Sequence, residues 1–347
     1  MARLSRAETQ ERNRRTVLAA ARAEFAERGY RDAKVDVIAE RAELTRGAVY
    51  SNFPSKRALY LAVLADDAEH AEAPPDPQLG RTPEQALGAF ARAWISRPRL
   101  QLTEILADQQ IRRPFTQLLR LDALLLALSL ERLRPPKRAP GAPPARLVRL
   151  AETVLTTLSG ASRLTRDAPG FVEPFDVISA CERLAGLALN DFWAPPHAIP
   201  PTRPADDPWS PPNTVHAVTG EPTTLTGDGV IAILGLHRVA AFEEAIRAGV
   251  DVTAVLVTSD PRELMPLARL VLSEVAGCLR QSFPGPTLPG LKLVYDDTGA
   301  LAAAAGVPAV SDETETAVRV AAGRIVARAE GPGATHAVAA LSRAEVT

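Results

Sequence analysis

The chain has 347 residues, of which 46% are hydrophobic and 23% charged, and its formal net charge is -1 at pH 7. This length predicts about two or three domains, and the composition is ordinary for a globular protein that buries real cores. No stretch reaches about 18 consecutive apolar residues and the N-terminus is basic and polar, so we expect a cytoplasmic protein with no membrane partner.

Cysteine and histidine usage argues against metal or thiol chemistry. Cys181 and Cys278 are too few and too far apart in sequence for a disulfide framework or a metal cluster. Each lies among apolar residues at helical spacing, so we expect both to be buried packing residues. The five histidines are dispersed, and none has a partner four residues away. The sequence therefore predicts no metal and no other cofactor.

Three helices are expected near the N-terminus, one long and two short. Residues 12–28 form an amphipathic helix, and Gly29 supplies the left-handed residue that ends it. A second helix follows from apolar residues spaced at i, i+3, i+4 and i+7, namely Val35, Ile38, Ala39 and Ala42. Thr45 is expected to cap a third helix, which directs Ala48, Val49 and Phe53 inward and stops at Pro54. Two short helices joined by a tight turn are typical of a DNA-binding motif whose second helix lies in the major groove.

The outward face of the third helix would meet the DNA; it carries Arg46, Gly47, Tyr50, Ser51 and Asn52. Glycine costs about 1 kcal/mol relative to alanine in a helix, but it allows the helix axis to approach a sugar–phosphate backbone closely. Ser55 is expected to cap the next helix, with Lys56 in the first turn beside a phosphate. Charge supports this interpretation, because residues 1–60 hold 13 Lys and Arg against 8 Asp and Glu.

Residues 10–64, with FAERGY followed by VIAERAELTRGAVYSNFPSKRAL, resemble the DNA-binding domain of the TetR family of bacterial transcriptional regulators. The glycine stop, an IAxxA helix, a TRGAxYxxF helix and a following SK occur in the expected order and spacing. The resemblance implies that Thr45, Arg46, Tyr50 and Ser51 approach bases or phosphates, with Tyr50 and Lys56 mainly on the backbone. The predicted DNA-binding set is Lys34, Val35, Thr45, Arg46, Gly47, Tyr50, Ser51, Asn52 and Lys56.

Two positions depart from the family pattern. Ala33 and Lys34 stand where a capping Thr or Ser is usual, so Asp32 is expected to cap the second helix instead. Glu43 occupies a turn position usually held by glycine, and a left-handed conformation there costs about 1 kcal/mol or more. The alternative to DNA binding is a protein-docking module in which Arg46 and Lys56 are ordinary solvated charges.

Residues 61–194 are predicted to be helical throughout, with leucine-rich stripes broken by a proline-rich loop at 134–144. Helices are expected through 147–158 and 177–187, the latter ending near 192–193. The resemblance implies that this part binds a small-molecule effector in its core. It also implies a homodimer, formed by the last two helices as a four-helix bundle.

Residues 195–212 are crowded with proline and are predicted to be an extended, semi-rigid spacer rather than a packed element. Beyond them, residues 213–347 have the pattern of an α/β domain. Strands are expected at 230–236, 252–258 and 291–295, helices at 239–248, 261–280 and 299–306, and a hairpin at 317–321 and 324–330 turning at Gly323.

This order of elements resembles a thioredoxin-like fold of the peroxiredoxin branch. The catalytic cysteine of that branch follows the early central strand, where this chain has Gly235, Leu236, His237 and Arg238. Residues 314–316 replace the usual proline before the hairpin. His237 and Arg238 are interpreted as a solvated surface pair, with an anion site as the alternative.

Asp296 and Asp297 are interpreted as helix-capping residues, with a carboxylate pair or a metal site as the alternative. From residue 215 onward there are 15 Asp and Glu against 10 Lys and Arg, so this part is not expected to bind DNA. It more plausibly senses a signal or docks a partner.

The predicted fold class is multidomain, with a helix-turn-helix domain at 1–60, an all-helical domain at 61–194, a linker at 195–212 and an α/β domain at 213–347. The predicted function is a homodimeric, ligand-responsive repressor that binds a palindromic double-stranded operator. Two alternatives remain. One is a peroxide or disulfide reductase carried on a DNA-binding adaptor, which the missing nucleophile argues against; the other is a regulator whose C-terminal part is only a protein-interaction module.

Overall fold

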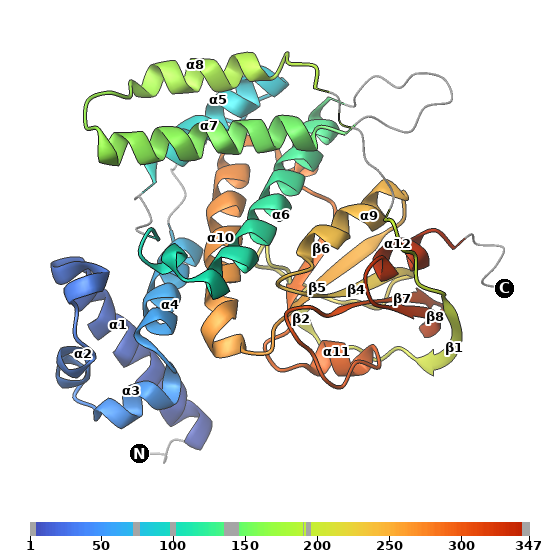
Figure 1. Cartoon of the computed structure of the whole chain (residues 1–347), viewed down its shortest axis with the longest axis horizontal. Helices are drawn as coiled ribbons and strands as arrows, with labels where there is room; N and C mark the ends of the chain where they lie inside the picture. The colour runs from blue at the N-terminus through green and yellow to red at the C-terminus, as the bar shows by residue number, and fades with distance from the viewer. Residues whose placement is uncertain are drawn as a thin grey trace.

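Four helices, α1 (Arg6–Asp32), α2 (Val35–Arg41), α3 (Arg46–Asn52) and α4 (Lys56–Glu69), form the N-terminal part of the chain, drawn in blue in Figure 1. The structure is a computed structural model that describes residues 5–71, 77–97, 102–134, 146–189, 191 and 196–341. Gly29 has the predicted positive φ, 70°, but it kinks α1 instead of ending it, and the helix continues to Asp32. We refer to residues 5–55 as the head.

The middle of the chain is helical, as predicted, with α5 (Pro83–Ser96), the 3-10 turn η1 (Ile105–Ala107), α6 (Gln109–Leu133), α7 (Val148–Asp167) and α8 (Pro174–Leu184). Helices α7 and α8 lie side by side at the top of Figure 1 and contact each other. Helix α8 ends at Leu184, before the end expected near 192–193, and residues 192 and 193 themselves lie outside the described residues. Residues 135–144 of the predicted proline-rich loop also lie outside them.

A six-stranded mixed sheet organises the C-terminal part, in the order β1-β8-β7-β4-β5-β6. The strands are β1 (Arg203–Pro208), β4 (Gly229–Gly235), β5 (Val252–Val257), β6 (Lys292–Tyr295), β7 (Glu315–Ala321) and β8 (Arg324–Glu330). Strands β4, β5 and β6 are parallel, whereas β7 is antiparallel to both β4 and β8. A separate two-stranded sheet pairs β2 (Thr214–Val215) with β3 (Pro222–Thr223). The three predicted strands and the hairpin are confirmed.

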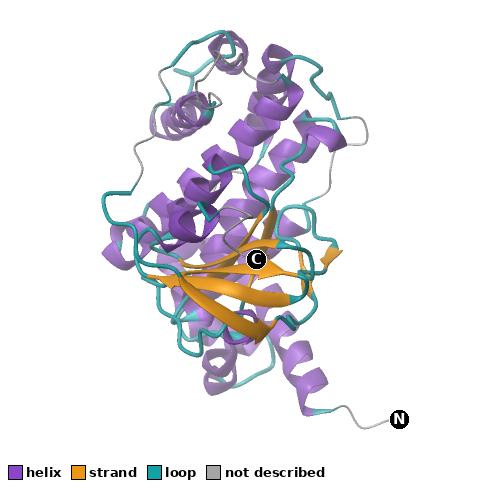
Figure 2. Ribbon diagram, turned by 90° about the vertical axis from the view of Figure 1, so that its right-hand side faces the viewer, coloured by secondary structure: helices purple, strands orange, loops and turns teal. Residues whose placement is uncertain are grey.

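Both faces of this sheet are covered, which explains the continuous apolar runs of β4 and β5. On one face, Val230, Ala232 and Leu234 of β4 belong to a core shared with α9 (Phe242–Arg247), α10 (Pro261–Ser282) and α12 (Ala334–Ala339). On the other face, Ile231 and Ile233 pack in a core with α11 (Ala300–Ala304). The alternation follows from the period of two along a strand. Figures 1 and 2 show the sheet beside the helical part.

The predicted spacer at 195–212 is wrong for residues 203–208, which form strand β1 and pair antiparallel with β8. Strand β1 lies at the edge of the sheet, where a proline without an amide donor is tolerated. Trp209, which follows it, is 5% exposed, and its Nε1 donates a hydrogen bond of 2.5 Å to the carbonyl oxygen of Leu225. This segment is therefore a packed element.

Helix α10 is the principal link between the two halves of the chain. It is 22 residues long, follows β5 closely and packs against α4, α5 and α6 (Figure 1). One cluster of buried residues consequently runs from Val17 of α1 to Ala339 of α12. In space, α10 belongs to the helical part, although the sequence places it among the strands. No helix within the described ranges is long and apolar enough to cross a membrane.

Candidate nucleic-acid interface

The turn between α2 and α3 has the predicted local geometry. Thr45 is the N-cap of α3, and its Oγ1 accepts a hydrogen bond of 3.2 Å from the amide of Ala48. Glu43 adopts a positive φ of 54°, as the departure from glycine at this position predicts. The buried side chains of Val49 and Phe53 then fix α3 against the other helices of the head. The opposite face of α3 is left at the surface.

The predicted cap of α2 is wrong. Lys34 holds the N-cap position without a side-chain cap, and Glu24 of α1 takes over by accepting a 3.3 Å hydrogen bond from the Lys34 amide. Glu24 is fully buried and also lies 3.3 Å from both Arg28 and Arg41. A buried carboxylate needs such partners. No local pattern pointed to Glu24, because its contacts with Lys34 and Arg41 form only when α1 and α2 pack.

Arg46 and Tyr50 lie on the outward face of α3, where Arg46 is exposed and Tyr50 is partly buried against the core. The guanidinium of Arg46 lies 5.5 Å from the ring centroid of Tyr50, and its Nη1 is 3.1 Å from Oδ1 of Asp36 on α2. Both charged side chains are 62% exposed, so the pair is weak and exchanges readily with other partners. Asp36 was not predicted, yet it pairs directly with the proposed base-contacting arginine.

Gly47 has no internal packing reason to be glycine. A Cβ built on it would meet no atom closer than Oγ1 of Thr45, at 3.9 Å, and its φ is not positive. Glycine at a helical position costs about 1 kcal/mol relative to alanine. The fold therefore bears a cost at this exposed position that close approach of an external partner would explain.

The remaining predicted contacts of α3 are less free than the sequence suggested. Ser51 and Asn52 both donate to the carbonyl oxygen of Ala48, at 2.8 and 2.9 Å. Ser51 is exposed, so its hydroxyl remains accessible to a partner, whereas Asn52 is partly buried. Both side chains therefore hydrogen-bond within α3 itself, and a partner would have to share or replace these hydrogen bonds.

Three predicted site residues outside α3 have different environments. The side chain of Val35 is 9% exposed and belongs to the core, as its place in the apolar stripe predicts, and its contact with DNA stays a prediction. Lys34 is exposed at the start of α2. Lys56 donates a 2.9 Å hydrogen bond to the carbonyl oxygen of Arg31 and lies 5.0 Å from the Tyr30 ring centroid. Partial burial lowers the pKa of Lys56, and a phosphate would have to compete with its internal partners.

Helix α10 contacts the head directly at the start of α4. Ser55, the predicted and observed N-cap of α4, donates from Oγ to both carboxylate oxygens of Glu263, at 2.7 and 2.8 Å. Arg57 pairs with the same carboxylate, with Nη2 2.6 Å from Oε1, and also with Asp108. Next to them, Arg262 donates a 3.3 Å hydrogen bond to the carbonyl oxygen of Ser51 in α3. We call these contacts the α10 clamp.

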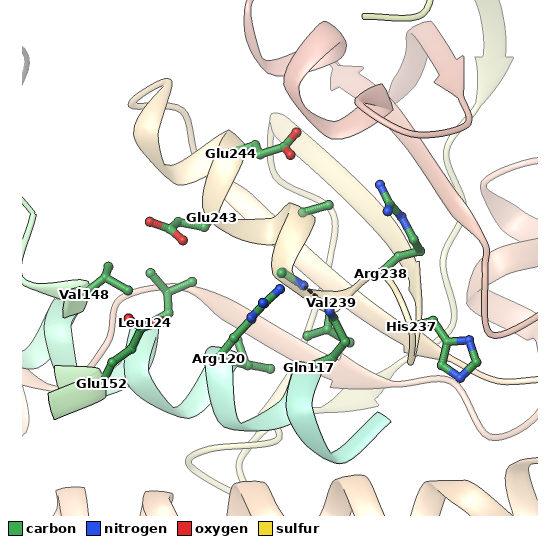
Figure 3. A pocket seen from close by; sticks show the side chains of 13 residues that line it. Gln117, Arg120, Leu124, Val148, Glu152, His237, Arg238, Val239, Glu243 and Glu244 are labelled. Carbon is green, nitrogen blue, oxygen red and sulfur yellow. Dashed lines mark hydrogen bonds between the residues drawn. The ribbon is translucent and has the colours of Figure 1, made fainter. Parts of the chain in front are cut away.

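The place where a thioredoxin-like fold would hold its nucleophile lies beside a cavity of about 390 Å³, which His237 and Arg238 help to line. Arg238 pairs with the fully buried carboxylate of Glu315, with Nε 2.9 Å from Oε2, so its interpretation as part of a solvated pair is wrong. His237 is partly buried and lies 3.1 Å from Glu313. Figure 3 shows the adjacent cavity, in which Gln117 of α6 accepts a hydrogen bond from the amide of Ala240.

Asp296 has the predicted capping role, since its Oδ2 accepts a 2.8 Å hydrogen bond from the amide of Ala302 in α11. Asp297 instead pairs with Arg269 of α10. Among the described residues, no group of three or more metal-binding side chains occurs.

Both cysteines are buried and free, as predicted. Burial raises the pKa of Cys278 to about 12 and that of Cys181 to about 11, so neither forms a thiolate readily at neutral pH.

Comparison with known proteins agrees with this geometry. The family model described as bacterial regulatory proteins, tetR family, matches residues 17–63. Over 111 residues the chain is 39% identical to two proteins of Pseudomonas putida, the HTH-type transcriptional regulator SrpR and the uncharacterized HTH-type transcriptional regulator TtgW. That stretch is 31% of this chain; it covers 52% of SrpR, about half its length, and 82% of TtgW.

Solved structures show only a loose overall likeness. A TetR transcriptional regulator from Rhodococcus sp. RHA1 is 18% identical, with a TM-score of 0.29, over 51% of this chain and 95% of its own. A structure described as the molecular basis for control of antibiotic production by bacterial hormones is 25% identical, with a TM-score of 0.33, over 50% of this chain and 95% of its own.

Proposed function

We propose that this chain, which belongs to the TetR family of bacterial regulatory proteins and is a DNA-binding transcriptional regulator, acts as a homodimeric, ligand-responsive repressor. The observation that carries the DNA-contact assignment is the exposed face of α3, on which Gly47 serves no internal packing need. Arg46 and Ser51 would meet the major groove there, with Tyr50, Thr45 and Lys34 beside the phosphates.

An apolar surface at α7 and α8 supports the proposed dimer. Phe171 and Phe175 are 74% and 76% exposed, and Leu164 near the end of α7 is 43% exposed. Cys181 is the only residue of α8 that is buried within this chain. Large exposed aromatic side chains grouped in this way are typical of a protein contact. A two-fold dimer through these helices would present two heads to a palindromic operator.

The α10 clamp supports the proposal that the C-terminal part contributes to the ligand response of operator binding. Helix α10 holds the start of α4 through Glu263 and the end of α3 through Arg262. Any ligand that prefers one position of α10 would therefore bias the position of the head. A preference of about 3 kcal/mol would lower operator occupancy roughly a hundredfold.

We further propose that the C-terminal α/β part is a thioredoxin-like, peroxiredoxin-related fold used for regulation rather than catalysis. The strand order β8-β7-β4-β5, with β4 and β5 parallel and β7 antiparallel to β4, supports the likeness. The buried, weakly acidic thiol of Cys278 and the pairing of Arg238 with the buried carboxylate of Glu315 favour a non-catalytic role.

Selection of bound fragments from genomic DNA at physiological salt would give the operator, and fluorescence anisotropy would then compare variants on operator and random duplexes. We expect Tyr50→Ala to weaken binding to both duplexes and Arg46→Ala to reduce the preference for the operator by about 1–3 kcal/mol. Arg149→Ala, which removes an exposed charge on α7, is the matched control. An Arg46→Ala variant that loses binding equally on both duplexes, or an Arg149→Ala variant that loses as much as Tyr50→Ala, would contradict the assignment.

Light scattering tests the dimer separately. We expect Phe171→Asp combined with Phe175→Asp to halve the molar mass in solution, because two charges would be placed in the apolar contact. A wild-type protein that is monomeric at micromolar concentration would refute the dimer without touching the DNA-contact assignment.

A further inference from the structure

A cavity of about 290 Å³ lies between α5, α6, α7 and α10, and its lining combines aromatic and charged side chains. Trp94 and Phe115 provide aromatic walls, and Trp94 Nε1 donates a 3.1 Å hydrogen bond to Ser162 of α7. Val271 and Glu274 of α10 complete the cavity from the C-terminal half of the chain. The volume is near the lower end of the range for small-molecule sites, about 300–1,000 Å³.

Asp122 of α6 is the unusual member of this lining. The residue is 2% exposed, and within the described part of the chain its Oδ1 is buried without a hydrogen-bond partner. A buried carboxyl without a partner is costly and is rare in folded proteins. A ligand that pairs with Asp122 would remove that cost.

The neighbouring charges indicate which ligand that is. Arg97 and Glu274 form an ion pair, with Nη1 3.4 Å from Oε1, and their side chains are 12% and 20% exposed. The guanidinium of Arg97 lies against the backbone of α10, because a Cβ on Gly277 would be 1.7 Å from its Nη2. The inner cavity thus holds two carboxyls but a single guanidinium, and one further positive charge would balance them.

The charges at the mouth are already partly compensated. Arg163 and Arg166 line the cavity, but both contact Asp167, at 3.1 and 3.3 Å. These two guanidinium groups share one carboxylate, but within the described residues neither of them pairs with Asp122, whose Oδ1 is left for a ligand to pair with.

We propose that this cavity binds a small amphipathic organic cation, with its ammonium group at Asp122 and its apolar body against Trp94 and Phe115. The faces of aromatic rings also attract cations, so the rings of Trp94 and Phe115 suit an ammonium group and the carbon atoms bonded to it. The inference rests on the proposed ligand response, since it names the chemical class of the effector. It also assigns α10 a role, because an occupant would touch the helix that carries Glu263 about three turns away.

The alternative is that Asp122 stays protonated and donates a hydrogen bond to a neutral ligand. Burial raises the pKa of Asp122 well above its usual range in the empty cavity, which is compatible with both ligand classes. A cationic ligand and a neutral ligand differ in charge, so comparing the binding of ligands that differ only in their charged group distinguishes the two possibilities.

Calorimetric titration of the full-length protein with 4-phenylbutylamine, 4-phenylbutan-1-ol and 4-phenylbutyrate tests the proposal, since the three share one apolar body. We expect the amine to bind at least tenfold more tightly than the alcohol, which is a difference in binding free energy of about 1.4 kcal/mol. The carboxylate should bind weakest. Equal binding of amine and alcohol, or no binding by any of the three, would overturn the proposal.

Two substitutions localise the effect. Asp122→Asn and Glu274→Gln each leave a single carboxyl beside Arg97, so the amine should lose its advantage over the alcohol in both variants. Asp251→Asn, the same chemical change at an exposed turn, should leave the advantage unchanged. An amine preference that survives both cavity substitutions would refute the assigned site, and the wild-type series remains decisive if one variant does not fold.

Operator binding is measured in parallel by anisotropy, with and without the amine. An operator complex that forms while no amine binds refutes the cation inference and leaves the regulator intact. An amine that binds without altering operator affinity supports the inference but refutes the proposed response of the regulator to this site.

Discussion

The α10 clamp predicts that a residue more than two hundred positions from the start of α4 in sequence stabilises the head. Glu263 and Arg57 are 12% and 19% exposed, and they pair at 2.6 Å. Removing one partner of a buried ion pair typically costs about 3–5 kcal/mol. Arg57 keeps Asp108 as a second partner and a glutamine at 263 could still accept from Ser55, so we expect Glu263→Gln to lower the free energy of unfolding by about 2–3 kcal/mol.

A double-mutant cycle isolates the pair. We expect a coupling energy of about 1–2 kcal/mol between Glu263→Gln and Arg57→Met in urea unfolding followed by circular dichroism. Amide hydrogen exchange should report faster opening of α3 and the start of α4 in Glu263→Gln, because the clamp contacts both segments.

The matched control is Glu27→Gln, which removes an ion pair with Arg41 inside the head. Glu27 is 55% exposed, so its loss should cost no more than about 1 kcal/mol. A coupling below about 0.5 kcal/mol together with unchanged exchange in α3 would refute the view that α10 holds the head in place.

Three further outcomes follow from individual contacts. Asp36→Asn should tighten binding to any duplex roughly two- to fivefold in anisotropy, because it releases Arg46 and removes a negative charge near phosphates; weaker binding would contradict the position of Asp36. Burial raises the pKa of Glu244 from 4.5 to about 7, so its contribution to stability is fully present below about pH 4.5 and is lost as the pH rises through about 7. Glu244→Gln should therefore raise Tm relative to wild type more at pH 8 than at pH 5, and an equal shift at both pH values would contradict this origin. Cys278 should resist labelling by a thiol reagent in the folded protein and react in urea; rapid labelling of the native protein would refute its burial.

Much of the helical head followed from local chemistry alone. The caps by Thr45 and Ser55, the positive φ of Glu43 and the burial of Val49 and Phe53 depend on residues within a few positions of one another, and each was predicted correctly. Ala48, expected to face inward, is only partly buried. The strands β4 and β5 were equally predictable, because a run of branched apolar residues has to be buried on both sides.

Interactions between distant segments could not be deduced in the same way. Glu24 replaces Asp32 at the start of α2, and residues 203–208 join the sheet as an edge strand. Each outcome depends on which element lies opposite, and the spacing of residues along one element does not contain that information.

The sequence by itself determined the family, the helix-turn-helix and the order of strands and helices from β4 onward, since these depend on short-range patterns of capping, periodicity and turns. The tertiary structure alone decided that α10 leaves the sheet, enters the helical part and supplies both Glu263 to the head and Glu274 to the cavity. The physical reason is that a 22-residue helix with a broad apolar face can be buried against any complementary face. Only the folded chain shows that α4, α5 and α6 offer that face.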